Sequence, residues 1–340
     1  MPYLDMKAEL AQCIPGMSRI YAGTLINRAW RIVRDSTLWS FQLIIGSFST
    51  PAMITQGTVT TPTLPSPSNI IGDAAATAAW SAITFPFITQ YQFRVGNYSI
   101  YNVIGYDVTT NAPFGTLFLD RPFVDPITNP VGNAYQLFQV YYPAPSKSFK
   151  RWLSVQDVVN GYSLNIWTGR RDVNFADPMR QMTTNPIAIM GTGQDKRPGS
   201  STPGYQLYEL WPVPSAKISY MTWYVDRGAD LILNQDTLPD PIPEDVVLMK
   251  ARVYAYEWAE ARKDVMAAKD SGANYAILKK TAEDDFLARL HTLRLEDKDA
   301  VDAFLARMKN ANAALGINPW YNSGIGRASM GWPAGLYRTI

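Results

Sequence analysis

The chain of 340 residues is poor in the residue types on which most catalytic and metal sites depend. It contains one cysteine, Cys13, and one histidine, His291. A single cysteine excludes an internal disulfide, and one histidine beside one cysteine leaves no ordinary zinc ligand set. No run approaches the ~18 apolar residues of a membrane span, and residues 1–5 do not begin a signal peptide. We therefore expect a protein used without secretion, with no cofactor and no metal.

Charge is also scarce. Charged residues make up 18% of the chain, below the ~25% of typical globular domains. The net charge of +2 is too small to indicate a dedicated nucleic-acid-binding face, and pairs such as Arg170-Arg171 are interpreted as solubilising charges. Aromatic residues are plentiful, with 10 Trp, 19 Tyr and 13 Phe. Because interfaces favour Tyr and Trp over Lys and Glu, this composition favours an oligomer over a β-rich monomer by about two to one.

No motif in the sequence indicates catalysis. His291 lies among arginines on a predicted helix without a nucleophile motif beside it, so we interpret it as a surface or interface residue. The run 191–197 lacks the spacing of a phosphate loop and leads into Pro198, which predicts a flexible loop. Acidic runs at 283–285 and 296–299 stand beside lysines and arginines, as on solvated helix faces. We expect no catalytic residues and no enzyme.

Helical periodicity marks both ends of the chain. Residues 2–13 predict a short helix that buries Cys13, and Ser18 caps a second helix that runs to about Asp35. The stripe of the second helix is Tyr21, Leu25, Ala29 and Ile32, widened by Trp30 and Val33. Pro243 begins a third helix, which continues to about 268 with the stripe Val247, Ala251, Tyr254, Trp258, Ala261, Val265 and Ala268. Two more helices follow, with stripes from Leu278 to Leu293 and from Val301 to Leu315, the last stopped by Gly316.

The middle of the chain alternates with a period of two. Residues 49–73 are rich in Thr, Pro and Ser and predict loops or extended chain, and 74–80 predict a short helix. Strands follow from Gln90 to Val225, and the last two, 205–211 and 217–225, are predicted to form a hairpin. Strands at such intervals predict a small barrel or sandwich.

Together these patterns predict an α+β fold. A discontinuous α-helical bundle, residues 1–48 and 236–316, carries an inserted antiparallel β-barrel or sandwich, residues 49–235, and residues 317–340 form an extended C-terminal arm. None of the helices can bury its stripe alone, so Val247, Tyr254 and Trp258 should pack against the helix of Tyr21, Leu25 and Ile32.

Five groups of residues, within about 25–265 and in the same order, resemble the head-to-tail adaptor (connector) proteins of tailed bacteriophages, including the podophage tail-tubular type. They are Ala29 to Arg34 with Leu38-Trp39; Tyr98 to Asp107 with Leu117 to Phe123, Ala134-Tyr135 and Tyr141 to Pro145; Asp177 to Arg180 with Asn185-Pro186; Tyr208 to Pro214 with Tyr224 to Arg227 and Ala229 to Leu231; and Leu238 to Pro243 with Ala255 to Ala259.

The resemblance implies a structural role without chemistry. Such adaptors form a ring, commonly of about 12 copies, that docks on the portal protein, contacts tail, nozzle or tail-terminator proteins, and passes double-stranded DNA. Their place is the neck of the virion, after assembly in the host cytoplasm. This chain is longer than the compact members of the family, which leaves open the tail component that it contacts.

The C-terminal arm is the predicted portal-binding segment. Residues 317–340 lack any regular period, yet they hold several aromatics and only two charges, unlike a disordered linker. Aromatic anchors carry much of the affinity where a partner supplies pockets. The expected portal-binding residues are Trp320, Tyr321, Arg327, Trp332 and Tyr337. Folding of the arm back over its own domain stays open.

Two other functions stay open. A tail or fibre-attachment protein would share the aromatic strands without needing a bundle that oligomerises. A glycosidase that uses only carboxylates would need two acids about 5–10 Å apart across a cleft.

Overall fold

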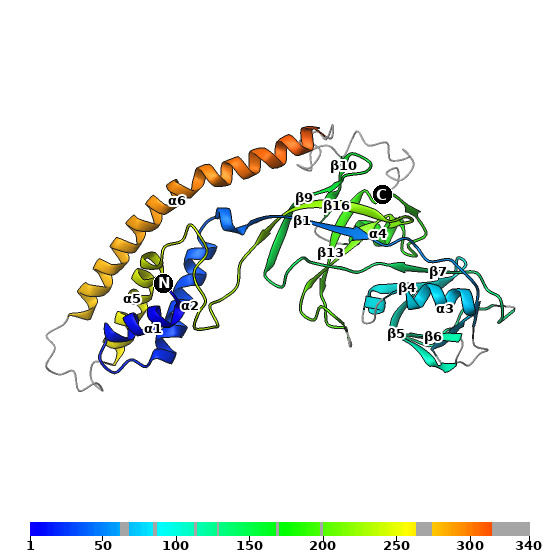
Figure 1. Ribbon diagram of the computed structural model, residues 1–340, viewed down its shortest axis with the longest axis horizontal. Coiled ribbons are helices and arrows are strands. Elements are labelled where there is room, and N and C mark those ends of the chain that lie inside the picture. The colour runs from blue at the N-terminus through cyan, green and yellow to red at the C-terminus, as the bar shows by residue number, and fades with distance from the viewer. Residues whose placement is uncertain are drawn as a thin grey trace. The chain divides into compact units, whose positions relative to one another are not determined.

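The long helices lie near the two ends of the chain, and the strands, with two short helices, lie between them (Figure 1). The computed structural model describes residues 1–61, 68–83, 87–111, 114–127, 129–167, 170–197, 200–262 and 274–314. A helical unit comprises Met1–Ile44 and Val225–Lys309, and a β-unit comprises Ile45–Tyr224 with residues 310–314 of the described chain. The predicted α+β class is confirmed. The predicted boundaries lay at 48/49 and 235/236, and the predicted arm, 317–340, lies outside the described residues.

The helical unit joins segments from the two ends of the chain. It contains α1 (Tyr3–Gln12), α2 (Arg19–Asp35), the 3₁₀ turn η1 (Ser40–Gln42), α5 (Glu244–Ala261) and most of α6 (Tyr275–Ala314). One apolar core spans them, and its largest contributions are Met6, Leu10, Leu25, Ile26, Trp30 and Trp39 from the first segment and Val246, Val247, Leu248, Phe286, Leu290 and Leu293 from the second. The N-terminal helices therefore complete their burial only with residues far along the chain.

The buried face of α2 follows the predicted stripe at Leu25, Ala29, Trp30 and Val33 but departs from it at Tyr21 and Ile32. Ser18 caps the helix as expected, since its Oγ accepts a hydrogen bond from Tyr21 N at 3.2 Å. However, Tyr21 and Ile32 are 37% and 45% exposed. The face is turned so that α1 approaches Gly23, whose carbonyl accepts a bond from Tyr3 Oη at 2.9 Å. A Cβ at Gly23 would lie 2.7 Å from that hydroxyl, so only glycine fits without a shift.

Helix α5 buries a stripe of small residues. Val247 and Ala251 are buried as predicted, and the stripe continues through Ala255 and Ala259. Tyr254 and Trp258 were predicted to be buried but are only partly covered. Trp258 lies at the rim, with its ring 5.4 Å from that of Tyr21. Residues 263–268, the predicted end of this helix, lie outside the described residues.

The predicted break between the last two helices is wrong. Helix α6 is continuous over 40 residues. The residues around the expected break, 294–300, include no glycine or proline, so nothing ends the helix there. The buried positions on α6 are Phe286, Leu290 and Leu293, followed one turn later by Asp297. Asp297 accepts a hydrogen bond from Ser40 N at 2.8 Å. The second stripe, from Val301 to Met308, is half-buried.

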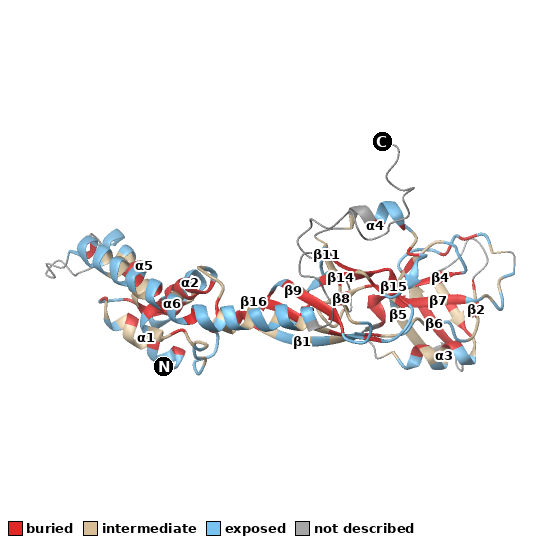
Figure 2. Cartoon of the chain, turned by 90° about the horizontal axis from the view of Figure 1, so that it is seen from above, coloured by how far each residue is buried: buried red, intermediate tan, exposed pale blue. Residues whose placement is uncertain are grey.

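The first sheet of the β-unit closes into a small barrel. Its order is β2-β3-β6-β5-β4-β7, and the bridges Ile54–Leu137 and Val59–Asn133 bring its two ends together. The strands are β2 (Val59–Thr60), β3 (Asn69–Gly72), β4 (Tyr91–Val95), β5 (Tyr101–Asn111), β6 (Phe114–Leu119) and β7 (Tyr135–Gln139). Helix α3 (Ala74–Ser81) was predicted correctly and places Trp80 in the core, where Nε1 donates to Tyr135 Oη at 2.9 Å. The turn η2 (Phe87–Gln90) precedes β4. Figure 2 shows the strands largely buried and α6 largely exposed.

The remaining strands form two four-stranded sheets and one strand pair. Their orders are β1-β16-β9-β10, β11-β13-β14-β8 and β12-β15. The strands are β1 (Leu43–Thr50), β8 (Tyr142–Pro143), β9 (Phe149–Asp157), β10 (Tyr162–Ser163), β11 (Asn165–Trp167), β12 (Thr183–Thr184), β13 (Ala188–Gln194), β14 (Gln206–Trp211), β15 (Val213–Pro214) and β16 (Ile218–Asp226), with the short helix α4 (Arg171–Ala176) between β11 and β12.

Two predictions fail in these sheets. Strands β14 and β16 belong to different sheets and form no hairpin, because the Pro-rich segment between them pairs as β15 with β12. The run 191–197 is not a flexible loop. Its first half completes β13, which pairs with β14, and its second half is fixed by the buried carboxylate of Asp195.

Candidate functional site

The residues discussed as possible site residues lie in the C-terminal segment and on α6. Trp320, Tyr321, Arg327, Trp332 and Tyr337 all lie outside the described residues. His291, interpreted as a surface or interface residue, is exposed on α6. Some of the described residues that carry the resemblance, in contrast, come together in two polar networks.

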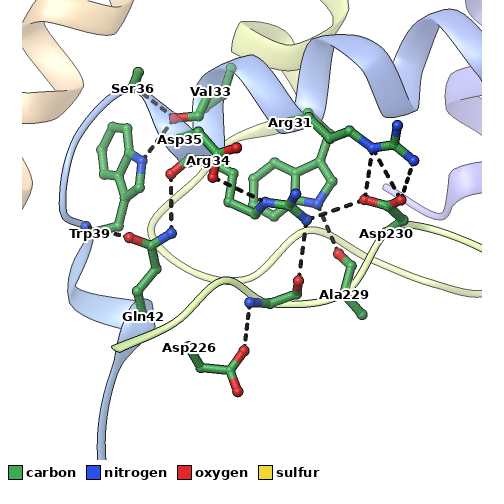
Figure 3. A network of polar contacts seen from close by, with 12 residues as sticks. Arg31, Val33, Arg34, Asp35, Ser36, Trp39, Gln42, Asp226, Ala229 and Asp230 are labelled. Atoms are coloured by element: carbon green, nitrogen blue, oxygen red, sulfur yellow. Dashed lines mark hydrogen bonds and ion pairs between the residues drawn. The ribbon is translucent and has the colours of Figure 1, made fainter. Parts of the chain in front are cut away.

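The first, the Arg34 network, lies in the helical unit (Figure 3). Arg34 is buried near the end of α2. Its Nη1 donates to Gly228 O and Asp230 Oδ1, both at 3.2 Å, and its own carbonyl accepts a bond from Gln42 Nε2 at 3.1 Å. Asp226 Oδ1 accepts a bond from Gly228 N at 2.8 Å. Arg34 therefore links the end of α2 to Gln42, just before β1, and to Gly228 and Asp230, just after β16.

Two tryptophans and a second arginine extend this network. Trp30 Nε1 donates to Ala229 O at 3.0 Å, and Trp39 Nε1 donates to Val33 O at 2.9 Å. Arg31 Nε donates to Asp230 Oδ2 at 3.1 Å. The bond from Arg31, with Arg34 nearby, outweighs burial and lowers the pKa of Asp230. Two of the resembling groups, around Trp30 and around Asp230, thus meet in one structure.

The second, the Arg180 network, lies in the β-unit. Arg180 binds the carboxylate of Glu209, which is 1% exposed, and also Asp177 O and Asn174 Oδ1. The backbone of Arg180 has φ 48°, a left-handed conformation that is unfavourable for a residue with a Cβ. The side-chain bonds hold it there. Asp177 in turn accepts bonds from Gln181 N at 2.7 Å and from Trp211 Nε1 at 3.3 Å.

Further arginines surround Glu209. Arg170 Nε lies 2.7 Å from Glu209 Oε2, so this carboxylate has two cationic partners. Arg94, also buried, donates to the carbonyls of Met179 and Arg180 at 3.1 Å. Arg170 was interpreted as a solubilising charge, but it fixes a buried carboxylate. No pattern in the sequence indicates this pairing, because Arg170 and Glu209 are distant in the chain.

A third polar cluster surrounds Asp195 at the end of β13. Its carboxylate accepts bonds from Arg197 Nη2 at 2.9 Å, Thr202 Oγ1 at 3.0 Å and Ser200 Oγ. Burial acts to raise the pKa of Asp195, but the bonds from Arg197 and Ser200 prevail and lower it to about 2. The sequence prediction missed this cluster, although Asp commonly accepts a hydrogen bond from the backbone two residues on, as Asp195 Oδ1 does from Arg197 N at 3.2 Å.

The turn after Asp230 holds two apolar side chains in solvent. Ile232 and Leu233 are 77% and 55% exposed. Their N–H groups donate to Asp236 Oδ2 at 2.6 and 2.7 Å, and Asn27 bonds both backbone groups of Leu231 at 2.9 Å. We call residues 231–236 the apolar turn. A fixed backbone with exposed apolar side chains loses little entropy when a partner covers it.

Each of the three polar clusters is built around a buried charged side chain. The buried carboxylates of Asp195 and Glu209 are each bound by arginine. Within the described ranges, no three acidic, histidine or cysteine side chains gather as they would to bind a metal. No described helix combines the length and apolarity of a membrane span. Compared with known proteins, the chain matches no family model and no curated sequence.

Proposed function

We propose that the chain is a structural subunit of a phage head-to-tail adaptor ring. One observation carries the proposal: the groups of residues that resemble adaptor proteins contact one another. The group Asp177 to Arg180 binds Glu209 and Trp211 of the next group, and Trp30 and Arg34 bind Ala229 and Asp230. Residues shared with a family of structural proteins are expected to build the framework, and these do.

The ring would be formed by neighbouring copies of the chain, with about 12 subunits as in the adaptors it resembles. The apolar turn supports an assembly, because Ile232 and Leu233 are exposed among the described residues and a neighbouring copy would bury them. The partners in the proposal are the portal protein, a tail or nozzle component, and double-stranded DNA that passes without sequence recognition.

Portal attachment is assigned to residues 317–340. Trp320, Tyr321, Arg327, Trp332 and Tyr337 supply large apolar contacts and one guanidinium, a composition typical of interface anchors. Ending the chain after Gly316 should leave a folded protein that no longer binds the portal of its particle. Normal attachment of the truncated chain would refute this role of the arm.

The mass of the assembled protein tests the ring itself. Sedimentation of the purified chain and images of the particle neck should both give a closed ring. Full-length protein that remains a monomer in solution, and is found on tail fibres in the particle, would replace the adaptor with the fibre-attachment function.

A further inference from the structure

The turn between β9 and β10 holds the only Asn-Gly pair in the sequence, Asn160-Gly161. In such a pair the backbone nitrogen of the glycine can attack Cγ of the asparagine side chain. The new N–C bond closes a succinimide ring and ammonia leaves; water then opens the ring to give aspartate or isoaspartate. Glycine permits this attack because it has no side chain to obstruct the ring. Asn160 is also exposed, so sequence and exposure together indicate a reactive site.

We propose that Asp157 protects Asn160 from this reaction, so that the fold keeps a deamidation site unreactive. The carboxylate of Asp157 is buried, and its Oδ2 accepts a hydrogen bond from Asn160 Nδ2 at 2.7 Å. Its Oδ1 accepts bonds from Val159 N at 3.0 Å and from Asn160 N at 2.9 Å. The side chain of Asn160 is therefore held toward Asp157, which precedes it in the chain, and not toward the nitrogen that follows it.

The nitrogen of Gly161 is hydrogen-bonded as well. Its N–H donates to Asp157 O at 3.0 Å. Gly161 has φ 72°, a left-handed conformation that glycine adopts without strain and that closes the turn. Attack requires this N–H to lose its proton and the side chain of Asn160 to rotate, so both hydrogen bonds must break first. Because one of them is made to a charged group, their loss should slow the reaction by about tenfold or more.

Deamidation would change the turn permanently. It replaces the N–H donor of Asn160 by a second carboxylate, which would repel the carboxylate of Asp157 at neutral pH. The turn presents Val158 and Val159, which are 49% and 74% exposed. Protection of Asn160 therefore preserves the shape of an exposed apolar end of a hairpin. The inference concerns one turn of the β-unit and does not depend on the ring.

Hydroxylamine cleaves an Asn-Gly bond through the same succinimide and so measures the reaction. In guanidinium chloride it should divide the unfolded chain into residues 1–160 and 161–340, which mass spectrometry identifies. The folded chain, without denaturant, should be cleaved at least about tenfold more slowly. Equal rates for the folded and unfolded chain would overturn the proposal, and this comparison needs no variant.

Two variants separate the role of Asp157 from the general effect of folding. Asp157→Ala removes the carboxylate and should raise the cleavage rate of the folded protein by about tenfold. Ser154→Ala is the matched control, because it removes a buried hydroxyl of β9 whose hydrogen-bond partners lie outside the turn. It should be cleaved at the rate of the unmodified protein. Tryptophan fluorescence checks that each variant is folded. A folded Asp157→Ala that is cleaved no faster than Ser154→Ala would show that Asp157 does not protect the site.

Discussion

The carboxylate of Asp195 should make the β-unit sensitive to acid, and its contribution can be calculated. Its pKa is lowered from 3.8 to about 2. At 1.36 kcal/mol for each unit, the charged form contributes about 2 kcal/mol to folding. Because the pKa in the folded state is the lower one, this stability is fully present above pH 3.8 and is lost as the pH falls through about 2.

Asp195→Asn removes the charge and keeps the size of the side chain. The variant should lose about 2 kcal/mol near neutral pH, and the difference from the unmodified protein should shrink toward zero as the pH approaches 2. Urea unfolding followed by tryptophan fluorescence at a series of pH values measures this difference. Asp299→Asn, at an exposed position of α6, is the matched control and should show no such trend. A loss that is equal at neutral and acid pH, or absent throughout, would refute the calculation.

Three further predictions concern the other features. Arg180→Met should destabilise the β-unit by about 3–5 kcal/mol in urea unfolding, because it removes a partner of the buried Glu209, and a loss below 1 kcal/mol would contradict this. Gly23→Ala should lower stability by about 1–3 kcal/mol, and Tyr3→Phe should relieve part of that loss by removing the hydroxyl that lies 2.7 Å from the new Cβ. Ile232→Asp should leave the unfolding midpoint unchanged but reduce ring formation in sedimentation; an intact ring would show that the apolar turn is not at a subunit contact.

The sequence predicts most of the helices and strands, and part of their buried faces. Helix α1, helix α2 and helix α5 are indicated by capping residues, by glycines and by the helical periodicity near the two ends of the chain. These patterns each depend on residues only a few positions apart. The buried positions Leu25, Ala29, Trp30 and Val33 of α2 were predicted correctly. The exposure of Tyr21 and Ile32 was not, because it depends on how α1 packs against α2 at Gly23. The continuity of α6 could have been read from residues 294–300, which include no helix breaker. Pairing of β15 with β12 rather than a hairpin depends on strands that meet only in the folded β-unit.

The polar networks were harder to predict from the sequence than the helices and strands. The resemblance named Asp177, Arg180 and Glu209, but not the contacts between them, because each is a single charged residue with many available partners. Asp195 was overlooked because Gly191 and Gly193, which lie within β13, suggested a loop. These charged residues are buried and hold the fold together, although charged residues are usually exposed. A single sequence therefore gives almost no indication that they are buried.

The discontinuous helical unit has a consequence for synthesis on the ribosome. Arg34 and its partner Asp230 are 196 residues apart in the chain. At translation rates of about 5–20 residues per second, the first two helices emerge roughly 10–40 s before the segment that completes their core. During that interval Trp30 and its apolar neighbours on α2 lack α5, so the nascent chain is exposed to aggregation and is a substrate for chaperones. The barrel between them, whose strands are close in sequence, can fold in the meantime.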